Sequence, residues 1–166
     1  FIPLGAIQTC MVPIVSYNFA AGKTDRCRKT LRAAICFGLV LMSLGTLCFE
    51  ILPSQMLGVF TSDAEVISIG SAGFLFVGAS FFPMVTSLIF PVFFQAVGSG
   101  FKSSALTVIR TVVPFVPLGY LFSRMGLGHF WMTFPVTETA TSIVGAVFYI
   151  SFVKKCGANA APAVKC

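Results

Sequence analysis

Charged side chains are scarce in this sequence. Only 10% of its 166 residues are Asp, Glu, Lys or Arg, while 57% are hydrophobic, and the mean hydropathy is +0.95. A typical soluble domain carries about 25% charged residues. A chain with so little charge cannot cover a globule with polar surface. The composition therefore excludes an ordinary water-soluble protein and indicates an integral membrane protein.

Clustered metal ligands are also lacking. The sequence has six Cys and one His, but no Cys-x-x-Cys pair and no His close to a Cys. Metal and redox sites need ligands at short spacing. Cys10, Cys36 and Cys48 lie inside apolar runs, where a thiol behaves as a small hydrophobic side chain. We therefore expect free structural thiols, with no metal site and no catalytic site.

The basic residues give a net charge of +6, which in a soluble protein could suggest a nucleic-acid partner. They fall in short runs at the ends of apolar segments and do not form a stripe interleaved with exposed aromatic residues. No nucleic-acid partner is therefore expected. A phosphate-binding loop at "AAGKT" is also disfavoured, because the first glycine of the GxxxxGK[ST] pattern is missing and no strand precedes it.

Five apolar segments are expected to be helical. Crossing about 30 Å of hydrocarbon takes about 20 helical residues. The segments are residues 1–21, 33–52, 63–98, 104–123 and 130–153. We predict an all-α, polytopic transmembrane bundle of about five helices, the first truncated at its start. The third contains Pro83 and Pro91 and is expected to be one long, kinked helix.

The two ends of the chain carry further expectations. Phe1 is neither an initiator Met nor preceded by a basic signal-peptide region, so the chain is expected to be the C-terminal piece of a longer protein. Residues 154–166 are small and polar after Lys154 and Lys155, and we expect a disordered tail there.

Lys and Arg are unevenly divided between alternate loops. The first turn holds Lys23, Arg26, Arg28, Lys29 and Arg32, the third loop holds Lys102, and the tail holds three Lys. The intervening loops hold Arg124 alone, so the division is nine against one. The positive-inside rule then places the first turn and the C-terminus in the cytoplasm. We expect a multi-pass membrane protein, surrounded by lipid.

Glu138 is the main candidate for chemistry. It lies eight residues past Phe130, about 12 Å into the membrane at 1.5 Å per residue. A bare carboxylate is costly there, so it is expected to be protonated, paired or facing a wet cavity. Two interpretations stay open: contact with a proton or drug cation, or a neutral Glu bonded to Thr137, Thr141 or a neighbouring helix. The other candidate cavity or coupling residues are Ser142 and Tyr149 on the same helix face, with Pro83, Thr86 and Gln8.

A second group of residues is expected near the cytoplasmic surface. Arg110 lies about 9 Å from the cytoplasmic end of its span, from where its side chain can snorkel to the interface. The estimated depths of Arg110 and Glu138 differ, so we do not predict a pair between them. Gly22 stands where a helix end needs a positive φ. The remaining candidates for this cytoplasmic anchor or gate are Asn18, Arg26 and Gln95.

Several stretches resemble one transporter family. "PIVSYNFAAGKTDRCRKTLR" resembles the exit of the eighth helix in multidrug and toxic compound extrusion (MATE) transporters, and "FPVFFQAVGSG" is similar to the end of their tenth helix. "TVIRTVVPFVPLGYLFSRMGLGHFWMTFPVTE" resembles their eleventh helix, outer turn and twelfth helix. The resemblance covers about residues 3–153 and is nearest to the bacterial branch of MepA-like drug exporters.

The resemblance implies a monomer of twelve helices in two six-helix lobes. This chain would hold the end of helix eight through helix twelve, a part of the second lobe, with the N-terminal lobe missing. The whole protein would not be an enzyme. It would export organic, often cationic, drug-like compounds by alternating access in exchange for H⁺ or Na⁺, with no other cofactor. Some members, the NorM type, carry an acid on their tenth helix, whereas residues 66–101 contain none.

Three alternative functions make different demands on the sequence. A lipid-linked oligosaccharide flippase of similar fold would need an arginine-rich cavity for a pyrophosphate. An intramembrane enzyme would need paired catalytic groups at membrane depth, and His129 with Glu138 is not such a pair. A scaffold subunit without transport activity stays open.

Overall fold

The computed structural model describes residues 2–158, and within that range the fold is built from α-helices and turns without a β-strand. The predicted all-α class is confirmed. The helices are α1 (Ile2–Ala20), α2 (Thr24–Ile51), α3 (Pro53–Gly58), α4 (Ala64–Ala96), α5 (Gly100–Thr111), α6 (Phe115–Arg124), α7 (Leu127–Phe130) and α8 (Thr133–Ala158).

Four helical stretches of the described chain are long and apolar enough to cross a membrane. They are Thr24–Ile51, Ala64–Ala96, Gly100–Arg124 and Thr133–Cys156. Four of the about five predicted segments thus contain such a stretch. Helix α1, which covers the segment predicted to be truncated, has 19 residues and is not among them.

Several helix bounds differ from the predicted segments. Helix α2 begins at Thr24, so most of the basic cluster forms its first turns and not a loop. The predicted span 104–123 consists of two helices separated at residues 112–114, because Pro114 and Pro117 have no backbone N–H to continue the hydrogen-bond ladder. Helix α8 continues to Ala158, so residues 154–158 of the predicted disordered tail are helical. Residues 159–166 of that tail lie outside the described range.

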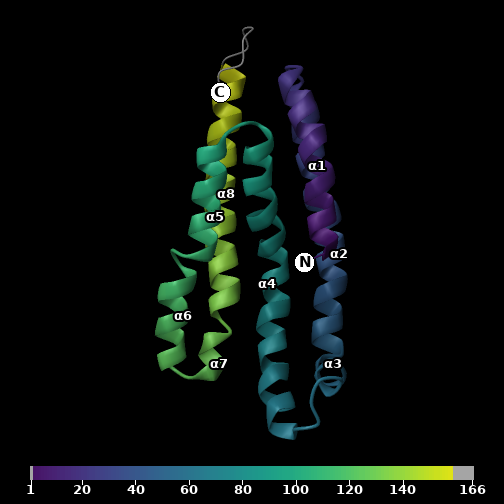
Figure 1. The fold of residues 1–166 in the computed structure, drawn as a ribbon, viewed down its shortest axis with the longest axis vertical. Helices are drawn as coiled ribbons and strands as arrows, with labels where there is room; N and C mark the ends of the chain where they lie inside the picture. Colours follow the sequence, from purple (N-terminus) through teal and green to yellow (C-terminus); the bar gives the residue numbers. More distant parts are fainter. Residues whose placement is uncertain (1, 159–166) are drawn as a thin grey trace.

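Helix α4 is the centre of the bundle. Its N-terminus is capped by Asp63, whose Oδ1 accepts a hydrogen bond from the Glu65 N–H (2.9 Å). The helix runs unbroken for 33 residues and packs against α1, α2, α5 and α8. Its second half holds much of the core, including Phe93 and Phe94, which are fully buried. Figure 1 shows α4 running along the bundle between α8 and the α1–α2 pair.

The helix directions bring the basic segments to one end of the bundle. The α1–α2 turn, the α4–α5 turn and the end of α8 lie at the upper end of Figure 1, while α3 and α7 lie at the lower end. Gly22 (φ +69°) and Gly98 (φ +76°) make the first two turns possible, since both adopt the left-handed conformation. At each, the next residue's N–H donates back to a carbonyl five residues earlier, Lys23 to Asn18 (2.8 Å) and Ser99 to Phe94 (2.9 Å).

Candidate functional site

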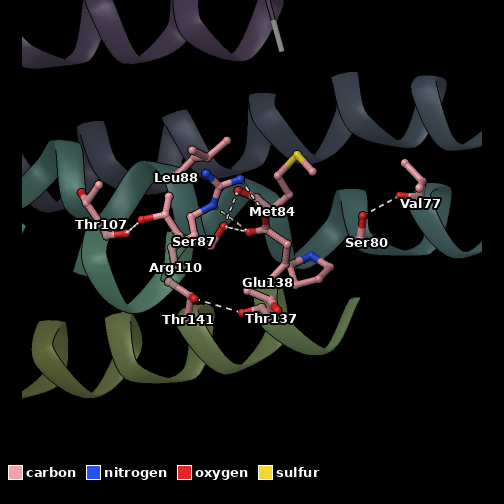
Figure 2. A network of polar contacts seen from close by, with 12 residues as sticks. Val77, Ser80, Met84, Ser87, Leu88, Thr107, Arg110, Thr137, Glu138 and Thr141 are labelled. Atoms are coloured by element: carbon pink, nitrogen blue, oxygen red, sulfur yellow. Dashed lines mark hydrogen bonds and ion pairs between the residues drawn. The ribbon is translucent and has the colours of Figure 1, made fainter. Parts of the chain in front are cut away.

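Arg110 and Glu138 form an ion pair inside the bundle (Figure 2). The Arg110 Nε–H donates to Glu138 Oε2 (3.0 Å), and Nη2 donates to Oε1 (2.5 Å). Only 20% of the arginine side chain and 8% of the glutamate side chain are exposed. Two parallel hydrogen bonds between a guanidinium and a carboxylate are the strongest common form of such a pair.

The pair between Arg110 and Glu138 was not predicted, because the depth estimated for Arg110 was too shallow. That estimate placed the start of the arginine's helix at residue 104, but α5 begins at Gly100 and Arg110 stands in its last turn. At 1.5 Å per residue, Arg110 is therefore about 15 Å from the start of its helix, deeper than estimated. Its side chain is held by Glu138 and does not snorkel to the end of the bundle.

A third helix contributes to this site through Ser87 of α4. The Ser87 hydroxyl is fully buried and donates to Glu138 Oε2, with a second contact to the Met84 carbonyl (3.1 Å). Both carboxylate oxygens of Glu138 are therefore bound, one by Arg110 alone and one by Arg110 and Ser87. Figure 2 shows these side chains converging between α4 and α8. The site ties α4, α5 and α8 together.

The threonines next to Glu138 do not bind it. Thr141 donates instead to the Thr137 carbonyl (2.9 Å), one turn back along α8. The hydroxyls of Thr137 and Thr133 are buried and have no hydrogen-bond partner among the described residues. Of the partners that the sequence left open for Glu138, the structure therefore shows residues of neighbouring helices, Arg110 of α5 and Ser87 of α4.

A cavity of about 210 Å³ adjoins the ion pair. It lies where α5 ends and α6 begins, since the break between these helices leaves the space beside α8 unfilled. Phe115 and Phe134 form an aromatic wall, with ring centroids 5.6 Å apart and an edge-to-face arrangement. The full set of lining residues is Met84, Arg110, Thr111, Phe115, Phe134, Thr137 and Glu138.

Three of the predicted cavity residues lie instead in the contact between α4 and α8. The hydroxyls of Thr86 and Ser142 are 2.5 Å apart, and Thr86 also donates to the Pro83 carbonyl (3.0 Å). Tyr149 packs against Phe90 with ring centroids 5.8 Å apart. These residues hold the two helices together and do not line the cavity beside Arg110, and neither does Pro83.

The remaining predicted residues lie away from the site. The Gln8 side-chain amide donates to the Leu88 carbonyl (3.2 Å), so it links α1 to α4. The buried Asn18 amide donates to the Ile14 carbonyl (2.8 Å) within its own helix. Gly22 forms the α1–α2 turn, and Arg26 and Gln95 are exposed.

Sequence reasoning missed Ser87 and the two phenylalanines of the aromatic wall. Ser87 is one of many small polar residues in apolar runs, and Phe115 and Phe134 are two of nineteen phenylalanines. Nothing in their local sequence distinguishes them. Within the described part of the chain, no group of three or more His, Cys, Asp or Glu side chains is placed to hold a metal ion.

Comparison with known proteins matches residues 1–121 to the MatE family. Among curated proteins, the chain is similar to an "FAD transporter" of Shewanella oneidensis (strain MR-1), with 22% identity over 147 residues. That alignment covers 88% of this chain and 32% of the relative, so the chain spans about a third of the relative's length. No solved structure matches the chain.

Proposed function

The chain belongs to the MatE family, whose members are membrane transporters and not enzymes, and from that premise we propose that it is part of a secondary active exporter of organic compounds. The exporter would work by alternating access in a bacterial cytoplasmic membrane, with H⁺ or Na⁺ moving inward as the compound moves outward. The remaining part of the transporter would supply the other lobe, and the complete protein would be a monomer surrounded by lipid.

The observation that carries this proposal is the buried ion pair of Arg110 and Glu138 beside a cavity at a helix break. Ionisable side chains within membrane spans are costly and commonly mark the paths of ions or substrates. Interrupted spanning helices are likewise found at transporter binding sites, because non-helical backbone at membrane depth is tolerated where it lines a cavity.

Glu138 is the proposed coupling group. A proton or Na⁺ on this carboxylate would weaken its attraction for Arg110, because the charge that holds the guanidinium would be neutralised. Arg110 is on α5 and Glu138 on α8, with Ser87 of α4 bound to the same carboxylate oxygen. Ion binding would therefore loosen the contact among three helices and change the balance between inward- and outward-facing states.

The orientation of the chain in the membrane is part of the proposal. The basic ends of α2, α5 and α8 lie together in Figure 1, and an excess of Lys and Arg marks the cytoplasmic side. We place the α1–α2 turn and the C-terminus there. In this orientation the cavity beside Arg110 lies toward the middle of the spans.

Export of a flavin dinucleotide is a second candidate function. The relative of this chain is named an FAD transporter, and the cavity offers an arginine and two aromatic rings. Multidrug export of cationic compounds stays the first candidate. An oligosaccharide-pyrophosphate flippase has less support, because an arginine-rich cavity is expected for it and Arg110 is the one arginine among the described residues that line this cavity.

The test is transport by the complete gene product in proteoliposomes. Ethidium and FAD would serve as substrates, under an imposed pH or Na⁺ gradient. We expect gradient-driven uptake of at least one, and we expect Glu138→Gln to reduce the exchange strongly. Glu50→Gln is the matched control, because Glu50 is an exposed carboxylate at the end of α2. Unchanged exchange in Glu138→Gln would remove this residue from the mechanism, and no gradient-driven transport of either compound would contradict the function.

A further inference from the structure

We propose that the cavity beside Arg110 is a binding subsite for the carboxylate or phosphate group of an aromatic substrate. This inference rests on the proposed function, and within it on the second candidate, since it assigns to the exporter a substrate with an acidic group at this site. It is drawn from three features of the cavity: the free edge of the guanidinium, the occupied state of the carboxylate, and the groups that surround them.

One edge of the Arg110 guanidinium has a nitrogen without an acceptor among the described residues. A guanidinium carries five N–H donors in a planar fork and can bind one carboxylate along its Nε–Nη2 edge and another along its Nη1–Nη2 edge. Glu138 occupies the first edge, through Nε and Nη2. Among the described residues none accepts a hydrogen bond from Nη1. The second edge is therefore available for a further bidentate bond to an acid.

The carboxylate of Glu138, in contrast, has little to offer an organic cation. Its Oε1 accepts from Arg110, and its Oε2 accepts from both Arg110 and Ser87. The glutamate side chain is also less exposed than the arginine side chain, 8% against 20%. Of the two charged groups that line the cavity, the accessible one is the positive one.

Three helix ends border the cavity. Phe115 is the first residue of α6 and Phe134 the second of α8, and Thr111 is the last of α5. The two N-termini carry a partial positive charge and the C-terminus a partial negative one, so the helix ends do not select an anion by themselves and Arg110 is the group that does. The two phenylalanine rings offer an apolar surface for an aromatic ring of the ligand. About 210 Å³ is less than a typical drug-sized pocket, so the cavity fits the acidic end of a larger molecule.

Thr137 gives the cavity a second polar group. Its side chain lines the cavity and is 2% exposed, yet its hydroxyl has no partner among the described residues. Buried hydroxyls in folded proteins are nearly always hydrogen-bonded. Threonine in a helix adopts either of two side-chain rotamers, which gives its hydroxyl more than one direction in which to reach a ligand. We assign it as a second donor to the ligand's acidic group.

Riboflavin 5′-phosphate and riboflavin are the probes, because they share a fluorescent ring and differ in the phosphate. Binding to the complete protein in lipid nanodiscs would be measured by flavin fluorescence anisotropy at fixed ionic strength. We expect the phosphate ester to bind about 10- to 100-fold tighter, the ratio that charge-assisted hydrogen bonds typically contribute. Equal affinities for the two compounds would overturn the subsite. Either the cavity would then bind no ligand, or an acidic side chain from elsewhere in the complete protein would already occupy it.

Two substitutions locate the phosphate. Arg110→Lys keeps a cation for Glu138 but removes the forked donor edge, and we expect the preference for the phosphate ester to fall to about threefold or less. Thr137→Val keeps the shape and removes the hydroxyl, with an expected loss of several-fold in affinity for the ester and none for riboflavin. Thr133→Val is the matched control, because that hydroxyl is equally buried and unpaired among the described residues but does not line the cavity.

A preference that survives both Arg110→Lys and Thr137→Val would also overturn the proposal. It would place the phosphate elsewhere, for example on the basic first turns of α2. Ethidium transport separates this result from failure of the proposed function. If ethidium is transported under a gradient but the protein binds riboflavin 5′-phosphate no tighter than riboflavin, the exporter function is supported and the subsite is contradicted. If Arg110→Lys and Thr137→Val both reduce the preference for the phosphate ester, but neither compound is transported under a gradient, the subsite is supported and the exporter function is contradicted.

Discussion

Gly145 of α8 lies directly against the ring of Phe90 of α4. A Cβ atom at Gly145 would stand 2.6 Å from Phe90 Cδ2, closer than non-bonded carbon atoms approach. The ring has little room to move, because Phe90 is 6% exposed and also stacks against Tyr149. The glycine therefore sets how closely the two helices pack, as small residues do where membrane helices approach each other.

Gly145→Val is expected to destabilise the protein by about 1–3 kcal/mol, the typical cost of forcing extra methyl groups into a packed interior. The measurement is the thermal unfolding midpoint of the complete protein in detergent. Gly119→Ala is the control, since its Cβ would meet Phe130 and Thr133 at 3.8 and 3.9 Å, ordinary contact distances. If both variants unfolded at the wild-type temperature, the close α4–α8 contact would be contradicted.

The ion pair of Arg110 and Glu138 predicts that substitutions at the two residues have non-additive effects on the free energy of unfolding. Arg110→Gln or Glu138→Gln alone leaves one buried charge without its partner, which typically costs about 3–5 kcal/mol. The double variant removes both charges, so we expect its destabilisation to be clearly smaller than the sum of the two single effects. Free energies of unfolding from denaturant titration of the four proteins would give the interaction energy. Additive effects would mean that the two side chains do not contact each other in the membrane.

The sequence predicted the class of the fold but not this pair. Composition decides the class because a spanning segment must be apolar and must satisfy its backbone hydrogen bonds internally. Glu138 could be predicted as a candidate functional residue for the same reason, because it is an acid inside an apolar run. Its contact with Arg110 depends on quantities that no local pattern carries: the start of α5 at Gly100, the break at residue 112 and the relative rotation of three helices. Ser87 could be found only once these were known.

The effect of each proline on its helix is also not predictable from local sequence. Pro83 and Pro91 lie within α4, which remains one helix, whereas the helix before Pro114 ends and a second begins at Phe115. All three prolines lack a backbone N–H, so their local chemistry is equal. Pro114 is followed three residues later by Pro117, and the packing partners of the two helices differ, since α5 packs mainly against α4 and α8 whereas α6 packs mainly against α7 and α8. Tertiary packing decides which proline ends a helix.

The arrangement of the helix ends predicts which positions share a side of the membrane. In a cysteine-free variant, Lys29→Cys and Lys102→Cys are expected to react with a membrane-impermeant thiol reagent from the same side, and Arg124→Cys from the opposite side. The reason is that the α1–α2 and α4–α5 turns lie at one end of the bundle, and the end of α6 at the other. Right-side-out and inverted vesicles would be compared. Labelling of positions 29 and 102 from opposite sides would contradict the fold in the membrane.

Lys102 gives the last prediction, since its ammonium group lies against rings of two other helices and has no acidic partner among the described residues. Its Nζ lies 5.3 Å from the ring centroid of Phe94 of α4 and 5.4 Å from that of Phe152 of α8. The two rings are themselves edge-to-face at 6.0 Å. A cation over an aromatic face typically contributes about 0.5–1 kcal/mol at exposed sites and about 2 kcal/mol where it is desolvated.

Lys102→Met keeps an unbranched apolar side chain over both rings and removes the charge. We therefore expect the thermal unfolding midpoint of the complete protein to fall by about 1–2 °C, because about 1 kcal/mol shifts the midpoint by about 2–4 °C in a protein of 150–250 residues and by less in a larger one. Lys102→Arg should keep most of the stability, because a guanidinium also stacks on aromatic faces. Lys29→Met is the matched control, an exposed lysine on α2 with no aromatic ring contact among the described residues. An equal change in Lys102→Met and Lys29→Met would show that the rings do not stabilise the ammonium group, and that α5 is held to α4 and α8 by apolar packing and the Arg110–Glu138 pair alone.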